Sequence, residues 1–181
     1  FKPDNRSGKN WSQNQFTVGT RTVAGIKSPT MVAVGKGGKI LSRDCDIIIA
    51  DDIEDHQTTQ QPGARESTRQ WWTTTLSSRK EEHTAVIVIG SRQHPDDLYN
   101  HLLDSDNFTS IVETAHAIEC DRPEHLEDEH VDCMLWPKKR SFKWLQSRLN
   151  SAESTGGRQT FEMVYYNQAY VEGTQIFTMN I

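Results

Sequence analysis

The succession of apolar and polar runs along the chain predicts strands separated by helices. Two apolar runs, Cys45–Ala50, which is interrupted by Asp46, and Ala85–Ile89, are typical of strands that are buried on both faces, as in a parallel sheet. Shorter runs rich in β-prone residues predict three further strands, at Gln15–Val18, Met31–Val34 and Thr109–Glu113.

Stretches without Gly or Pro between these runs predict helices. The longest runs from Ala64 to Arg79, and another covers Asp96–Leu103 just after a proline that suits a first helical turn. Two more are expected at Phe142–Leu149 and Arg158–Tyr170, separated by the soft segment Ser151–Gly157. The alternation of strands and helices predicts an α/β fold with a mostly parallel sheet flanked by helices.

Length and charge narrow the classes of protein. The 181 residues suit one domain, and 25 acidic against 20 basic side chains give a net charge of −5. This balance excludes a basic coat for nucleic acid, so a DNA contact must be a local patch, for which Lys138–Arg140 with Lys143 and Arg148 is the candidate. The chain has no apolar run long enough to cross a membrane. Because it begins with Phe1, we expect it to be a piece of a longer protein.

The first apolar run ends in two carboxylates, Asp51 and Asp52. A rigid strand holds its last residue at a fixed point, and open α/β sheets place ligands at the carboxyl ends of their strands. There Asp51 can hold Mg²⁺, usually through water, and Asp52 can orient or deprotonate an attacking water. Glu54 on the same loop is a rival for the second role. The alternative is that the acids only cap the following turn.

The second apolar run is followed by Gly90, Ser91 and Arg92. The glycine permits a sharp turn, and the hydroxyl or guanidinium could then contact a γ-phosphate and respond to its presence. The alternative is an ordinary ion pair between Arg92 and Asp96 or Asp97.

Taken together, these features resemble the ATPase part of the large subunit of phage terminase, the motor that moves DNA into an empty capsid. The similarity runs over nearly the whole chain, and its landmarks occur in the family's order. They are Trp11 with Phe16–Val18, Gly35–Arg43, Asp46–Asp52, Val88–His94 with Asp96–Tyr99, Leu135–Pro137, and Phe161–Gln168 followed by Gly173 and Phe177.

The resemblance implies a P-loop ATPase fold and a role for each candidate residue. Asp51 would hold Mg²⁺, Asp52 would be the catalytic carboxylate, and Ser91 and Arg92 would couple ATP hydrolysis to movement. The family more often has Glu at the position of Asp52, which keeps Glu54 as an alternative. Arg43 would be an arginine finger that reaches a neighbouring subunit; its alternative is a salt bridge with a nearby aspartate.

The resemblance also implies ATP and Mg²⁺ as cofactors. The implied partners are double-stranded DNA, the portal protein, the small terminase subunit and copies of the chain in a ring, in the host cytoplasm. Other hypotheses are a non-catalytic prophage remnant and a helicase-like ATPase. The P-loop itself, Gly-x₄-Gly-Lys-[Ser/Thr], does not occur in the sequence. We therefore expect residues 1–137 to be an incomplete ATPase core without ATP turnover of its own, and residues 138–181 to be a helical lid and linker to a nuclease domain.

Cysteine and histidine usage predicts little chemistry. Three cysteines, an odd number, are widely spaced, which favours a reducing cytosol over a disulfide scaffold. Cys120, His125, His130 and Cys133 are all zinc-ligand types, but their spacing matches no common zinc finger. Since acidic residues surround them, residues 119–133 are interpreted as a solvated loop. The histidines at 56, 83, 101 and 116 show no pattern.

Overall fold

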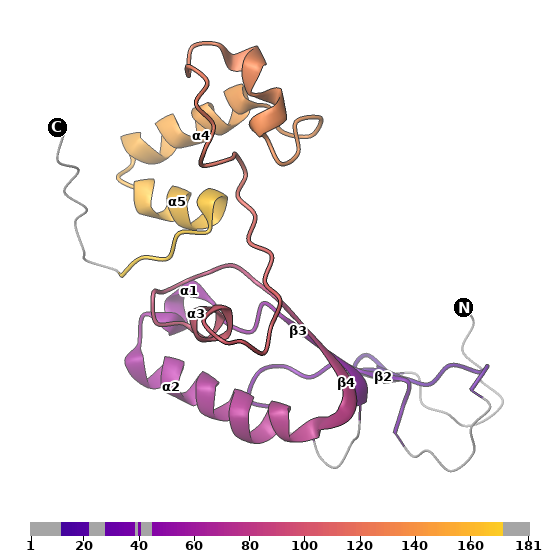
Figure 1. The fold of residues 1–181 in the computed structure, drawn as a ribbon. Coiled ribbons are helices and arrows are strands. Elements are labelled where there is room, and N and C mark those ends of the chain that lie inside the picture. The colour runs from indigo at the N-terminus through magenta and orange to yellow at the C-terminus, as the bar shows by residue number, and fades with distance from the viewer. Residues whose placement is uncertain (1–11, 22–27, 39, 41–44, 172–181) are drawn as a thin grey trace. The chain divides into compact units, whose positions relative to one another are not determined.

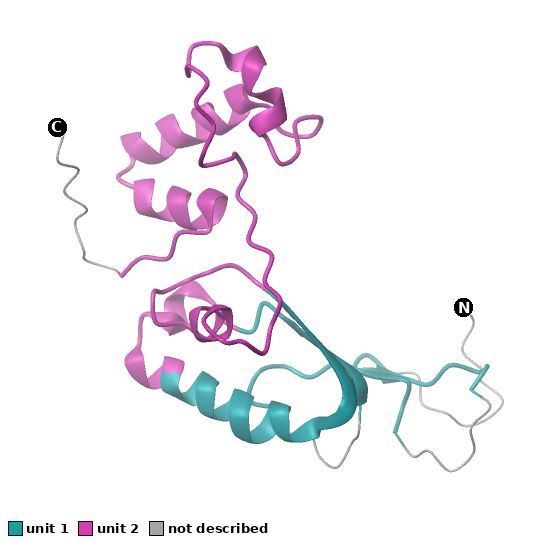
Figure 2. Cartoon of the chain, viewed as in Figure 1, with its two compact units in different colours: residues 1–53, 66–89 teal, residues 54–65, 90–181 magenta. Residues whose placement is uncertain are grey.

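The structure is a computed structural model that describes residues 12–21, 28–38, 40 and 45–171 (Figure 1). The chain divides into two compact units, coloured separately in Figure 2. Unit 1 comprises residues 1–53 and 66–89, and unit 2 comprises residues 54–65 and 90–181. The predicted boundary at residue 138 concerns a linker to a further domain and stays a prediction.

Unit 1 contains two small sheets. Strands β1 (Gln15–Phe16) and β2 (Met31–Val32) pair antiparallel. Strands β3 (Cys45–Asp51) and β4 (Lys80–Ile89) pair in parallel, and their register aligns the last residue of each, Asp51 with Ile89. The strands expected at these four places are therefore confirmed, although β1 and β2 are shorter than predicted and β4 begins earlier.

Helical segments occupy the sequence between the two parallel strands, as a parallel connection requires. They are α1 (His56–Thr59), α2 (Pro62–Trp71), a π-helical turn η1 (Trp72–Leu76) and a 3₁₀ turn η2 (Ser77–Arg79). The last three cover the helix expected over 64–79. Trp72 and Leu76 are buried. The fold is thus mixed α/β, with a small parallel sheet flanked by helices.

Burial on both faces of the strands was a wrong expectation for the described part of the chain. Ala50 is buried, but alternate residues of β3 and β4 leave an isoleucine face in solvent, with exposed fractions between 47% and 59%. This face consists of Ile47, Ile49, Ile87 and Ile89. The register places Ile49 opposite Ile87, so the four side chains share one side of the sheet.

The third strand of the predicted parallel sheet does not form. Residues 109–113 have no regular structure, and Ile111 is 84% exposed. β-Propensity reflects the fit of side chains to a pleated neighbour, and no such neighbour lies beside this segment in the described residues.

Unit 2 is helical. Its longer elements are α3 (Leu98–Leu103), the 3₁₀ helix η3 (Glu127–Cys133), α4 (Phe142–Ser154) and α5 (Arg158–Tyr166). Two of these begin at a side chain that caps a backbone amide, Asp97 for α3 and Ser141 for α4. Helix α4 continues past its expected end, and Gly156, with φ of 73°, makes the turn into α5.

A small core joins η3, α4 and α5. Its buried members are Met134, Phe142, Leu145 and Phe161. The segment that precedes η3 is held to this core through its backbone, because the amide of Ala115 donates to the carbonyl of Tyr165 and His116 pairs antiparallel with Met134. The interpretation of residues 119–133 as a solvated loop is therefore wrong in part: η3 is helical, and its His130 is 1% exposed.

Candidate functional site

The carboxylate pair Asp51 and Asp52 lies at the carboxyl end of β3. Asp51 is the last residue of the strand, and the amide of Asp52 continues the pairing by donating to the carbonyl oxygen of Ile89 at 3.0 Å. Both residues are exposed. The predicted position of the pair at a strand end beside a parallel neighbour is confirmed. An exposed carboxylate held by a strand is a ligand type that Mg²⁺ accepts.

Asp52 has an unusual backbone conformation. Its φ is 45°, in the left-handed region that glycine prefers and that Asp tolerates better than most residues. Such conformations cost energy and concentrate at sites where function requires them. The backbone therefore leaves the extended conformation at Asp52, directly after β3.

Glu54, the rival carboxylate, belongs to unit 2 and is 5% exposed. Its Oε2 accepts a hydrogen bond from the backbone amide of Leu98 at 2.7 Å. Leu98 is the first residue of α3, so the carboxyl group of Glu54 lies at the amino end of that helix. Glu54 therefore has a structural contact of its own, whereas Asp52 remains exposed.

The predicted coupling residues follow directly after β4 and belong to unit 2. Ser91 is exposed, and the backbone amide of Arg92 donates to Oδ1 of Asn167 at 2.8 Å. In the described part of the chain, the buried Nε of Arg92 has no hydrogen-bond partner. Gly90 is required for space, because a Cβ there would overlap the ring of Tyr99. We expected the glycine to permit a sharp turn, but the structure shows that it makes room for the ring of Tyr99 against the backbone.

The alternative in which Arg92 pairs with Asp96 or Asp97 is not seen among the described residues. Asp96 instead accepts from Nε of Arg65 at 3.0 Å. Asp97 is fully buried and accepts from the backbone amides of residues 93, 94 and 100. Both aspartates therefore have partners other than Arg92.

The segment between β4 and α3 also contains a buried histidine, His94. His94 is 7% exposed, and its Nδ1 accepts from the amide of Asp96 at 2.9 Å. Burial lowers the pKa of His94, and the charge of Arg65 lowers it further, against opposing effects of Asp96 and Asp97. The imidazole is therefore kept neutral.

Arg43 lies outside the described residues. Asp51 and Asp52 belong to unit 1, whereas Glu54, Ser91 and Arg92 belong to unit 2. The two aspartates therefore belong to one unit, and the contacts of Glu54, Ser91 and Arg92 are described within the other unit.

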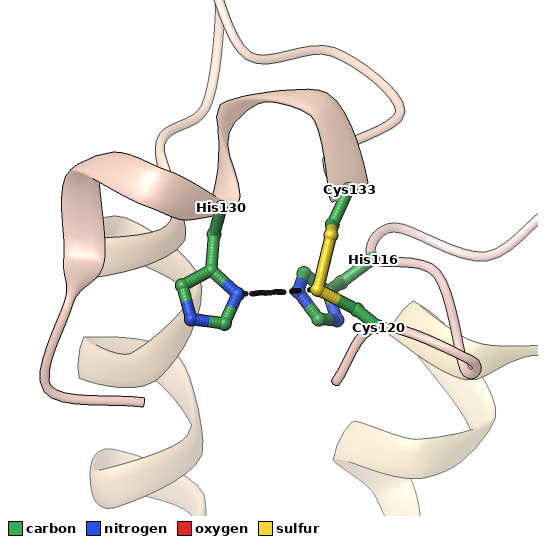
Figure 3. Close-up of side chains that lie close together, drawn as sticks. All are labelled: His116, Cys120, His130 and Cys133. Carbon is green, nitrogen blue, oxygen red and sulfur yellow. Dashed lines mark hydrogen bonds between the residues drawn. A yellow bond between two sulfur atoms is a disulfide. The ribbon is translucent and has the colours of Figure 1, made fainter. Parts of the chain in front are cut away.

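A second group of reactive side chains lies in unit 2, shown in Figure 3. The His/Cys cluster consists of His116, Cys120, His130 and Cys133, whose nitrogen and sulfur atoms all lie within 4.8 Å of one another. Contrary to the expectation of unpaired cysteines, Cys120 and Cys133 are joined by a disulfide. Burial lowers the pKa of His116, and His130 lowers it further.

Sequence reasoning found three members of this cluster and missed the fourth. It considered Cys120, His130 and Cys133, but with His125, which is exposed and is not a member. His116 was set aside because its spacing fits no linear motif. Only its backbone pairing with Met134 brings it to η3.

The basic cluster at the start of α4 lies beside two indole rings, one exposed and one partly buried. Trp136 is 65% exposed, and Nζ of Lys139 lies 4.9 Å from its ring centre. The guanidinium carbons of Arg140 and Arg148 lie 4.2 and 5.3 Å from the ring of Trp144. Cations that stack on aromatic rings in this way also suit contacts to nucleic acid.

Comparison with known proteins adds no family. The chain matches no family model, and it has no significant match among curated proteins. Among the helices of the described residues, none has the length and apolar character needed to cross a bilayer.

Proposed function

We propose that the chain is part of the ATP-hydrolysing motor that translocates double-stranded viral DNA into a procapsid, as the large terminase subunit does. The observation that carries the proposal is Asp51 at the carboxyl end of a parallel strand, followed by Asp52 in a left-handed turn. Parallel sheets of nucleotide-binding folds present their ligand-binding residues at this edge. The aligned end of β4, which leads into Gly90, Ser91 and Arg92, supports the same reading.

In this proposal each residue has one task. Bound Mg²⁺ would neutralise charge on the ATP phosphates, and Asp51 would hold the ion. Asp52 would orient the attacking water and accept its proton. Glu54 is the alternative base, but its hydrogen bond to the amide of Leu98 favours Asp52.

The remaining candidates would respond to the phosphates. Ser91 and Arg92 would detect the γ-phosphate, and Ser91 is exposed close to the aligned end of β4. Arg43 would act as the arginine finger. The P-loop that cradles the phosphates would come from another part of the polypeptide.

The isoleucine face of the β3–β4 sheet supports the idea of a larger sheet. Parallel sheets in α/β proteins are covered on both faces. An apolar face that is about half exposed therefore fits a fold in which further strands and helices cover it.

The proposed partners follow from the resemblance: double-stranded DNA, the portal protein, the small subunit and further copies in a ring, within the host cytoplasm. The basic cluster with Trp136 and Trp144 is the surface of unit 2 that best suits DNA phosphates.

The first experiment is to sequence the DNA upstream of the codon for Phe1. An in-frame P-loop after an apolar strand would complete the ATP site. An in-frame start codon without a P-loop would remove the enzyme hypothesis and leave only the fold.

The second experiment uses the full-length product of that reading frame, if it contains a P-loop. Asp51→Asn and Asp52→Asn should each lower ATP hydrolysis by at least about 10²-fold, because removing one group that acts on the transition state has effects of that order. Asp46→Asn is the matched control, since Asp46 lies on the same strand with a side chain that is 92% exposed. ATP hydrolysis that survives both substitutions would contradict the proposal. Strand separation without DNA translocation would indicate a helicase instead.

A further inference from the structure

The His/Cys cluster has the donor atoms of a tetrahedral metal site. Nε2 of His116 lies 2.9 Å from Nδ1 of His130, and Sγ of Cys120 lies 3.6 Å from the same nitrogen. In a tetrahedral zinc site with bonds of about 2.0–2.3 Å, neighbouring ligand atoms are roughly 3.3–3.8 Å apart. Once the disulfide is reduced and its sulfur atoms move apart, the four side chains can surround one ion, and Figure 3 shows that they converge.

The backbone fixes the protonation state that a metal ligand needs. Nε2 of His130 lies 3.2 Å from the carbonyl oxygen of Pro123. A carbonyl can only accept, so Nε2 carries the proton, and in the neutral ring Nδ1 has a lone pair directed at the cluster. Metal-binding histidines are oriented by this kind of hydrogen bond to a carbonyl.

Two imidazoles are buried beside the disulfide. His130 is 1% exposed and His116 is 8% exposed, and burying polar rings is costly unless their nitrogens have partners. In the disulfide form the two rings are hydrogen-bonded to each other, because Nε2 of His116 donates to Nδ1 of His130 at 2.9 Å. A metal ion would replace this bond with one nitrogen ligand from each ring, together with both sulfur atoms.

The His/Cys cluster lies beside a small core that a bound metal ion would stabilise. The ring of His130 stacks on Phe142 with centroids 3.7 Å apart and an interplanar angle of 5°, so the cluster sits against the core of η3, α4 and α5. Among the described residues that core has four buried members, with partly buried residues packed around them, and small cores commonly need a metal or a disulfide to be stable. His116, Cys120 and His130 also line part of a pocket of about 350 Å³.

We propose that His116, Cys120, His130 and Cys133 bind one structural Zn²⁺. The mixed nitrogen and sulfur donors favour zinc, and four protein ligands leave no open position for catalysis. Both cysteines bind as thiolates, so uptake of Zn²⁺ by the dithiol releases two protons. The disulfide is the metal-free oxidised form. Its reduction takes two electrons and two protons from two molecules of a low-molecular-weight thiol, which become one disulfide.

The test is zinc content under reducing conditions. The full chain, freed of any affinity tag, is purified with a phosphine reductant and analysed for metals. We expect about one zinc per chain in the unchanged protein. His116→Ala should lose most of it, whereas the matched control His125→Ala should retain it. Equal zinc in the two variants would contradict the proposal, and so would loss in His125→Ala alone.

A second measurement covers the case in which a variant fails to fold. The unchanged chain is reduced, stripped of metal with a chelator and titrated with Co²⁺. A tetrahedral site with two thiolates should give intense visible bands that saturate at about one Co²⁺ per chain and disappear when Zn²⁺ is added. A reduced chain that gives no such bands would overturn the proposal. Neither measurement depends on ATP, so the zinc site and the motor hypothesis can fail independently.

Discussion

The carboxylate pair after β3 and the His/Cys cluster are assembled in opposite ways. Asp51 and Asp52 are neighbours in the sequence, are exposed, and rest on a sheet of two strands. The His/Cys cluster gathers side chains from residues 116 to 133 and rests on a buried phenylalanine. Contiguous residues stay together whatever surrounds them, whereas convergent residues stay together only while a core holds them. The integrity of the cluster should therefore depend on stability, and that of the carboxylate pair much less.

The sharpest way to test this difference is to remove the ring under the cluster. Phe142→Ala should lower the free energy of unfolding by about 3–5 kcal/mol, because it leaves a cavity in the core and removes the ring on which His130 stacks. Denaturant unfolding under reducing conditions measures this loss. Val164→Ala in α5 is the control, since Val164 is 58% exposed and should change stability by less than about 0.5 kcal/mol.

The same variant should leave the carboxylate pair unaffected while it disrupts the His/Cys cluster. If Phe142→Ala cost less than about 1 kcal/mol, the core of η3, α4 and α5 would not be what holds the cluster together.

A smaller effect is expected from His94, a buried histidine outside the His/Cys cluster. His94 has a lowered pKa because it is buried, with Arg65 adding to the effect and Asp96 and Asp97 opposing it. At a pH below 6.5, the ordinary pKa of histidine, His94 is protonated in the unfolded chain but stays neutral in the folded chain until the pH reaches its lowered pKa. The free energy of unfolding should therefore fall as the pH drops from about 6.5 towards the lower folded pKa, by at most about 1.4 kcal/mol per pH unit.

His94→Asn isolates this contribution, because the amide oxygen can still accept from the amide of Asp96 but does not titrate. The difference in unfolding free energy between the unchanged chain and this variant, measured from pH 7.5 to 5, should shrink or change sign as the pH falls. A difference that stays constant over that range would show that His94 is not kept neutral by the fold.

The sequence predicted the elements whose signals are local. The apolar runs bounded by Asp51 and Gly90 predict β3 and β4, and α2 begins at Pro62, two residues before the predicted start at Ala64. Pairing and convergence are tertiary properties, and the sequence predicted them poorly. Residues 109–113 have the composition of a strand but no partner, and His116 reaches the cluster only through its pairing with Met134. Similarly, an apolar run predicts a strand that suits burial on both faces, but it does not show whether other elements cover those faces. The described residues leave the isoleucine face exposed.

The turn at the carboxylate pair offers a smaller test. Asp52 has φ of 45°, which costs most for a residue with a Cβ and no local hydrogen-bonding group. Asp52→Ala should therefore be less stable than Asp52→Gly by about 1 kcal/mol, whereas Asp52→Gly should be at least as stable as the unchanged chain. Thermal unfolding of the three proteins measures the order. If the alanine and glycine variants were equally stable, the left-handed turn would not store strain, and its support for a catalytic Asp52 would be lost.

The smallest effect is expected on the isoleucine face of the sheet. Ile49 is 59% exposed, so Ile49→Thr, which keeps a β-branched side chain, should change the stability of this chain by less than about 0.5 kcal/mol. In a longer protein whose further strands and helices cover this face, the same substitution should cost about 1–3 kcal/mol, since it would bury an additional hydroxyl. Measuring both proteins turns one substitution into a probe of what lies over the sheet. An equal, small effect in both would mean that the longer protein leaves the face exposed, and the carboxylate pair would then stand on a sheet without the second layer that an ATPase core requires.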